Sequence, residues 1–136
     1  LRAQSWMVPP LMVDLVCHWV SQPTAHELLA WQTQELAARQ QIVTDYLAGY
    51  SLSRQPNGSN VWLTLPDGVR ALELCERLNQ QGVKVTNAEP FCVGSAPAPQ
   101  AVRICIGAAA DQTALKRALA ILRASLEQPP LATVTV

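Results

Sequence analysis

Three short segments of this chain alternate apolar and polar residues, and this alternation limits the folds that the chain can adopt. The segments are residues 60–66 (NVWLTLP), 83–87 (VKVTN) and 101–107 (AVRICIG). Because successive side chains of a strand point to opposite faces, each segment can turn one row of apolar side chains to the same side. The pattern therefore predicts a small sheet with one apolar face that other elements must cover.

Helical patterns follow two of these segments and can supply that cover. One helix is predicted to begin at Asp67 or Gly68 and to end at Gly82, and another is predicted to follow an N-cap at Asp111. Apolar residues recur at helical spacing in both, as Leu72, Cys75 and Leu78 in the first and Leu115, Leu119, Leu122 and Leu126 in the second. We therefore expect an α+β fold, in which a small, mainly antiparallel sheet carries helices on one face.

The first third of the chain contains two further helical patterns. Two adjacent prolines can open a first helix, which the sequence SQPT interrupts. Thr24 with Glu27 forms a capping-box pattern at the start of a long helix that is predicted to reach about Leu47. The expected parts are a helix and linker over residues 1–22, a domain over residues 23–128 and a tail over residues 129–136.

The opposite face of the predicted sheet is mixed in character. It carries Trp62 and Arg103 near the middle of two strand segments. A charge buried alone costs several kcal/mol, so Arg103 must reach water at a solvated edge, form an ion pair with a residue such as Glu89, or meet an anion from outside the chain. We interpret Trp62 as core or interdomain packing.

Composition and charge exclude several classes of protein. The chain has 136 residues, a formal net charge of +0 and ten Lys and Arg that form no run, so it lacks the electrostatic footprint of a nucleic-acid reader. No apolar stretch approaches the roughly 20 residues of a membrane span. The N-terminal residues lack the apolar core of a signal peptide, so we expect a cytoplasmic protein without membrane partners. Because the chain begins with Leu1, we also expect it to be part of a longer polypeptide.

The four cysteines, Cys17, Cys75, Cys92 and Cys105, lie far apart in the sequence and form no C-x-x-C motif. Neither histidine stands at metal-ligand spacing from them. We therefore expect free thiols that pack as small hydrophobic residues, with a disulfide or a metal site as the alternative.

The order of the predicted elements, with the residues in them, resembles a known domain. The segments NVWLTLPDGVRALELCERLNQQGVKVTNAEPFCVG and AVRICIGAAADQTALKRALAIL resemble the C-terminal small domain of fold-type I pyridoxal-phosphate (PLP) enzymes. The segment SWMVPPLMVDLVCHWVSQPTAHELLAWQTQELAARQQIV is similar to the corresponding part of MocR-type regulators of the GntR family. In that family a winged-helix DNA-binding domain is fused to an aminotransferase-like domain.

The resemblance implies that the cofactor site lies elsewhere in a longer protein. The family's Schiff-base lysine and its phosphate-binding residues belong to a large domain that would precede this chain. Lys84 begins a strand and Lys116 lies on the outer face of a helix, so neither resembles that lysine. We therefore expect PLP in the parent protein, no cofactor in this chain alone, and a parent homodimer built largely through the large domain.

The resemblance also implies roles for three residues of this chain. Arg103 stands where the family's small domain supplies the arginine that binds the substrate α-carboxylate. Asn60 matches a position that approaches the substrate side chain, and a turn residue is the alternative interpretation. Phe91 matches an aromatic residue near the closing active site, with core packing as the alternative. The sequence TNAEPF lacks the Pro-Gly that the family often has before this point.

Three functions follow from these expectations. In the first, the chain is the ligand-closing subdomain of a regulator that binds DNA through a winged helix and senses an amino acid or amine with PLP. In the second, it is the small domain of a working aminotransferase, in which the same arginine orients the amino acid. In the third, it is an unrelated protein-interaction module that uses the mixed face of the sheet. The first two predict that the chain alone is catalytically silent.

Overall fold

The computed structural model describes residues 8–128. The predicted tail, residues 129–136, and the first seven residues of the predicted N-terminal segment lie outside the described residues. The chain divides into two units, Leu1–Glu35 and Leu36–Val136, and each is considered by itself.

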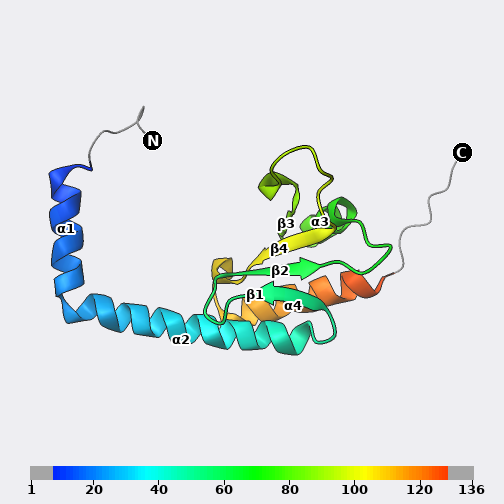
Figure 1. The fold of residues 1–136 in the computed structure, drawn as a ribbon. Coiled ribbons are helices and arrows are strands. Elements are labelled where there is room, and N and C mark those ends of the chain that lie inside the picture. Colours follow the sequence, from blue (N-terminus) through cyan, green and yellow to red (C-terminus); the bar gives the residue numbers. More distant parts are fainter. Residues whose placement is uncertain (1–7, 129–136) are drawn as a thin grey trace, which may run out of the picture. The chain divides into compact units, whose positions relative to one another are not determined.

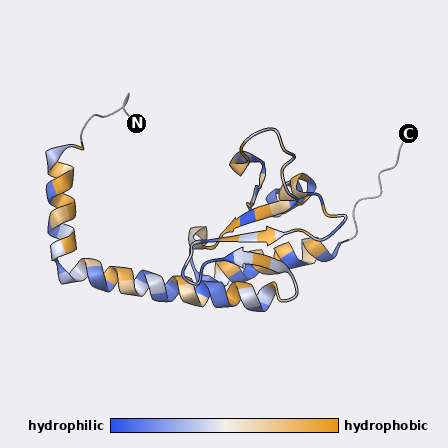
Figure 2. Cartoon of the chain, in the orientation of Figure 1, coloured by the Kyte–Doolittle hydropathy of each residue, from blue (hydrophilic) through white to orange (hydrophobic). Residues whose placement is uncertain are grey.

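Unit 1 contains α1 (Pro10–Ser21) and the first part of α2 (Pro23–Tyr46). The helix α2 begins at Pro23, because proline already has the backbone φ of a first helical residue. Thr24 therefore lies within the first turn and is not the N-cap that the capping-box pattern predicts. No residue of α1 is buried, and Figure 2 shows hydrophobic residues along its length. Its exposed large apolar side chains are Leu11, Met12, Val13, Leu15, Val16, Trp19 and Val20.

Unit 2 contains a four-stranded sheet in which every neighbouring pair of strands is antiparallel (Figure 1). The strands are β1 (Ser51–Arg54), β2 (Asn60–Thr64), β3 (Thr86–Asn87) and β4 (Ala101–Cys105). Their order is β1-β2-β4-β3, so β2 and β4 are the interior strands. The predicted α+β fold with a small antiparallel sheet is confirmed.

The strand β3 is shorter than the sequence predicts, and the first residue of the predicted segment belongs to the end of the preceding helix. The N–H of Val83 donates to the carbonyl of Leu78 at 2.9 Å, and Gly82 has a φ of 77°. This arrangement closes the C-terminus of the helix with a left-handed glycine. Pairing of β3 with β4 is confined to Thr86 and Asn87.

The helix α3 (Ala71–Gln80) begins later than Asp67 or Gly68, where the sequence pattern predicts its start. Gly68 has a φ of 86°, which excludes it from a right-handed helix. The side-chain oxygen of Gln100 then accepts a hydrogen bond from the Ala71 N–H at 2.8 Å and satisfies one free donor of the first turn. Leu72 is 68% exposed, and Leu74 faces the core in its place.

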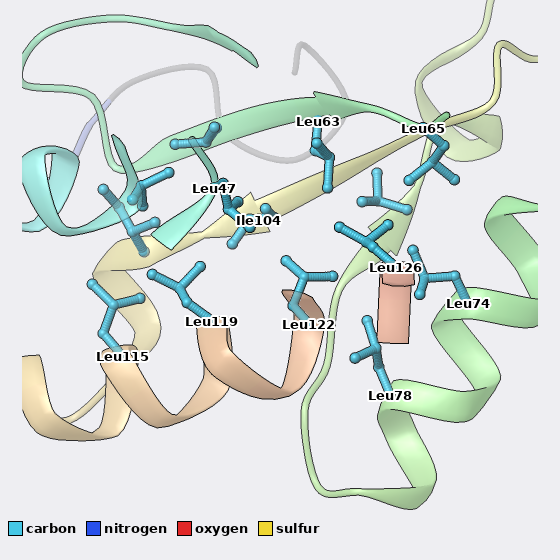
Figure 3. Packing of buried hydrophobic residues seen from close by; sticks show 14 of the residues in the cluster. Leu47, Leu63, Leu65, Leu74, Leu78, Ile104, Leu115, Leu119, Leu122 and Leu126 are labelled. Carbon is cyan, nitrogen blue, oxygen red and sulfur yellow. The ribbon is translucent and has the colours of Figure 1, made fainter. Parts of the chain in front are cut away.

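The helix α4 (Gln112–Glu127) agrees with its prediction. The carboxylate of Asp111 accepts a hydrogen bond from the Ala114 N–H at 2.7 Å, which is the expected N-cap. Its four predicted inward residues are buried, and Figure 3 shows leucines of α4 and α3 meeting Leu63, Leu65 and Ile104 of the sheet side. This packing covers one face of the sheet, and we call the opposite face, on which Trp62 and Arg103 lie, the uncovered face.

The second part of α2 adds to the same core through Ile42 and Val43. It also buries the charge of Arg39, which no sequence pattern indicates. The guanidinium of Arg39 donates to the carbonyl oxygens of Ile106 and Ala109, each at 2.8 Å. These two hydrogen bonds join α2 to the segment that follows β4, and they fix the position of the end of that strand.

Candidate functional site

The uncovered face of the sheet brings Arg103 and Trp62 together. In the strand register, Trp62 of β2 lies opposite Arg103 of β4, and Arg103 lies opposite Thr86 of β3. The apolar neighbours Val102 and Ile104 are buried, so alternation places Arg103 on the other side of the sheet. Because β4 is an interior strand, Arg103 is not at a solvated sheet edge.

Phe91 completes a cluster with these two residues. It ends a short 3-10 helix (Glu89–Phe91) that follows β3. The central guanidinium carbon of Arg103 lies 4.8 Å from the centre of the Phe91 ring. The Phe91 ring in turn meets the Trp62 ring edge to face, with ring centres 5.3 Å apart and planes at 84°. We call these three residues the Trp62–Phe91–Arg103 cluster.

Arg103 has no anionic partner among residues 8–128. It makes no ion pair there, with Glu89 or with any other described carboxylate, and its Nε is buried without a hydrogen-bond partner. A cation held against an aromatic face is stabilised by the ring's electrons, but this leaves the N–H donors unused. The cluster therefore presents a guanidinium that is oriented and still able to bind an anion.

Asn60 lies on the same face of the sheet but is not part of this cluster. It pairs across the sheet with Cys105, and its side-chain amide donates to the hydroxyl of Ser59 at 3.2 Å. It is exposed and borders a shallow hollow of about 410 Å³ that Trp62 also lines. The structure thus brings Arg103 and Phe91 together and leaves Asn60 outside their cluster, in a hollow that it shares with Trp62.

Trp62 is a member of the site that the sequence interpretation as core or interdomain packing does not identify. It is half-buried on the uncovered face, away from the helices. The signal was present in the alternation, which puts Trp62 and Arg103 on one face. The contact with Phe91 could not be found in this way, because Phe91 lies in a loop whose path no periodicity describes.

The two lysines and the possible metal ligands are further candidates for a site among residues 8–128. Lys84 and Lys116 are both exposed, so neither has the desolvated surroundings that a Schiff-base lysine requires. Within residues 8–128 there is no group of three His, Cys, Asp or Glu that could hold a metal ion. The same residues include no helix that is long and apolar enough to cross a membrane.

The four cysteines are free thiols, as predicted. Burial raises the pKa of the Cys75 thiol, and a hydrogen bond with the Asn87 backbone partly opposes that change. Cys17, Cys92 and Cys105 are exposed, so the expectation that all four pack as small hydrophobic residues is wrong for these three.

Comparison with known proteins supports the same assignment of fold. No protein-family model matches the chain. The chain is structurally similar to the α-aminoadipate aminotransferase LysN of Thermus thermophilus, which was solved with N-(5′-phosphopyridoxyl)-L-leucine. The TM-score is 0.66 at 21% identity, over 82% of this chain and 29% of that one. It is also similar to an archaeal alanine:glyoxylate aminotransferase, with a TM-score of 0.58 at 17% identity over 69% of this chain and 23% of that one.

The fold is therefore that of an aminotransferase small domain. In sequence the chain is 31% identical over 120 residues to YdeF, an uncharacterised HTH-type transcriptional regulator of Bacillus subtilis strain 168. That match covers 88% of this chain and 26% of the regulator, so the chain spans about a quarter of its curated relative. The chain resembles the small domain of aminotransferase-like proteins, and among them the MocR-type regulators of the GntR family.

Proposed function

We propose that this chain is the ligand-closing C-terminal subdomain of a PLP-binding, aminotransferase-like transcription regulator. In this proposal Arg103 binds the carboxylate of an amino-acid ligand. The observation that carries it is the guanidinium of Arg103, which is oriented by an aromatic ring and has no anionic partner among the described residues. The similarity to a transcriptional regulator and to aminotransferases supports the parent protein that we infer.

The chemistry of the cluster suits a carboxylate. A guanidinium offers a planar fork of donors that can bind both oxygens of a carboxylate at once. An interior strand holds the base of this fork more rigidly than a loop would. Phe91 orients the guanidinium and lies beside the bound ligand. Asn60, which is outside the cluster, approaches the ligand side chain.

The remaining functions belong to parts of the parent protein outside this chain. A large domain supplies the PLP site with its lysine, because both lysines here are exposed. The apolar residues of α1 are exposed within unit 1, and we infer that α1 packs on that large domain. A winged helix supplies DNA binding, and the parent is a cytoplasmic homodimer.

Binding of a ligand at Arg103 stabilises the closed state of the domain. A ligand shifts the balance between open and closed states only if it binds the closed state more tightly. A carboxylate that is bound by Arg103 in the closed state alone provides that difference in affinity. The closed population then reports the ligand to the DNA-binding part of the parent protein.

A genuine aminotransferase is the second candidate, because both solved neighbours are aminotransferases. Arg103 serves either function, so it does not separate them. The coding sequence upstream of Leu1 does: a winged helix before a cofactor-lysine motif supports the regulator, and the lysine motif alone supports the enzyme. A self-contained interaction module would have neither, and its Arg103→Ala variant would leave small-molecule binding unchanged.

Two unreactive probes test the role of Arg103 in the parent protein. N-(5′-phosphopyridoxyl)-L-alanine carries the carboxylate, and N-(5′-phosphopyridoxyl)ethylamine is the same molecule without it. We call the ratio of their dissociation constants, measured by calorimetry, the carboxylate advantage. Arg103→Ala is expected to remove about 2–5 kcal/mol of binding from the alanine probe alone, because the carboxylate loses its charged partner.

Arg103→Lys is the matched control, since it keeps the charge but loses the fork. It should retain part of the carboxylate advantage. The proposal fails if Arg103→Ala leaves the advantage within experimental error of the wild type, or if the wild-type protein binds neither probe.

A further inference from the structure

We propose that Trp62 is a positioning residue for Arg103, which it orients through Phe91. This inference rests on the proposed function, since it concerns the arginine that binds the carboxylate. Trp62 itself needs no contact with the ligand. Its effect is to hold the ring against which the guanidinium lies.

The first step of the argument is that nothing polar holds the guanidinium in place. An arginine side chain has several rotatable bonds, and an ion pair or hydrogen bond usually restricts them. Within residues 8–128, Arg103 has neither, and its Nε is buried without a partner. The guanidinium carbon lies 4.8 Å from the centre of the Phe91 ring, so the position of that ring helps to set the position of the fork.

The second step is that Phe91 is poorly held by its own segment. It ends a 3-10 helix of three residues, and it is 44% exposed. The core on the other face of the sheet does not include it. A side chain in such a place keeps one orientation only if a neighbour restricts it. The edge-to-face contact with Trp62, at 5.3 Å and 84°, supplies that restriction.

The third step is that Trp62 is itself well anchored. It is on the interior strand β2, between the buried residues Val61 and Leu63. It also lies directly opposite Arg103 in the register, where cross-strand side chains come within contact distance. The indole therefore transmits the rigidity of the sheet to Phe91 and fills the space beside Arg103 toward β1.

The two phosphopyridoxyl probes, used on the parent protein, test this role. Trp62→Leu is expected to lower the carboxylate advantage by about two- to tenfold, the range that corresponds to the loss of one aromatic pair. The dissociation constant of the ethylamine probe should stay unchanged. Trp62→Phe keeps a ring that can meet Phe91 and should restore most of the advantage.

Thr64→Leu is the matched control, because Thr64 lies two residues along the same strand on the same face and pairs with Ala101. It should leave the carboxylate advantage unchanged. If Trp62→Leu does not fold, Trp62→Thr replaces it, since threonine suits a half-exposed strand position. The same loss of carboxylate advantage is expected from either variant.

Two results would overturn the inference. One is a Trp62→Leu protein that folds and keeps the full carboxylate advantage. The other is an equal loss of affinity for both probes, which would mean that Trp62 only supports the fold. If Arg103→Ala leaves the advantage intact, the proposed function itself fails. If Arg103→Ala removes the advantage and Trp62→Leu does not, only the role of Trp62 fails.

Discussion

Two arginines of this domain show how differently the same side chain can be used. Arg39 is buried, and it binds two carbonyl oxygens of the chain that follows β4. Arg103 is half-buried and lies against an aromatic ring without an anionic partner among the described residues. The first arrangement satisfies the donors and serves stability. The second leaves donors free, which is the arrangement that a ligand site requires.

Replacing Arg39 by methionine tests the structural role directly. The substitution leaves the carbonyls of Ile106 and Ala109 without their donor. The free energy of unfolding is expected to fall by about 1–3 kcal/mol, the usual cost of unpaired buried polar groups. Urea denaturation of this chain measures it. Arg117→Met at an exposed position is the control, and equal stability of the two variants would contradict the account.

At the residue scale, the sequence predicts some of the site. The alternation in residues 101–107 places Arg103 on the face away from Val102 and Ile104, and the structure agrees. The contact with Phe91 is not predictable in this way, since it depends on the path of a loop. Arg39 is missed because its partners are 67 and 70 residues away in the sequence.

At the scale of elements, the sequence predicts the boundaries that local signals determine and misses those that depend on tertiary contacts. The helix α4 has both a capping carboxylate and a regular leucine spacing, so its start and its buried face are predicted correctly. The starts of α3 and β3 are not predicted correctly. The left-handed backbone of Gly68 delays the start of α3, and the hydrogen bond from Val83 to Leu78 keeps Val83, the first residue of the predicted strand, at the end of the helix. Both depend on how the chain turns in space, which sequence periodicity does not record.

Asp111→Ala tests the cap at the start of α4. The Ala114 N–H loses its acceptor, and the free energy of unfolding is expected to fall by about 1 kcal/mol. Asp111→Asn keeps an acceptor oxygen and should recover most of that loss. Asp67→Ala is the control, because Asp67 is exposed and precedes α3 without capping it. A drop as large for Asp67→Ala as for Asp111→Ala, in thermal or urea unfolding, would refute this assignment.

At the scale of the whole molecule, the chain supplies the arginine that its resemblance implies but no lysine in surroundings that suit a cofactor. It offers an oriented arginine, but both of its lysines are exposed. A Schiff-base lysine needs desolvated surroundings beside a phosphate site, and an exposed side chain lacks such surroundings. The chain also spans 26% of its curated relative, so the catalytic or sensing unit that we propose is larger than this domain.

The isolated chain is accordingly expected to be catalytically silent. Mixed with PLP, L-alanine and an α-keto acid acceptor, it should form pyruvate no faster than free PLP does. The variant Lys84→Ala with Lys116→Ala is the control and should give the same rate. Turnover that exceeds the free cofactor and disappears in this variant would place the cofactor lysine within this chain and contradict the proposed division of roles.

The role of Arg103 is tested most directly by a crystal structure of the parent protein with N-(5′-phosphopyridoxyl)-L-alanine. The carboxylate oxygens are expected to lie about 2.7–2.9 Å from two nitrogens of Arg103. Phe91 should remain against the guanidinium and Trp62 against Phe91. A carboxylate bound by other residues, with Arg103 paired to an acidic side chain of the parent protein, would contradict the account.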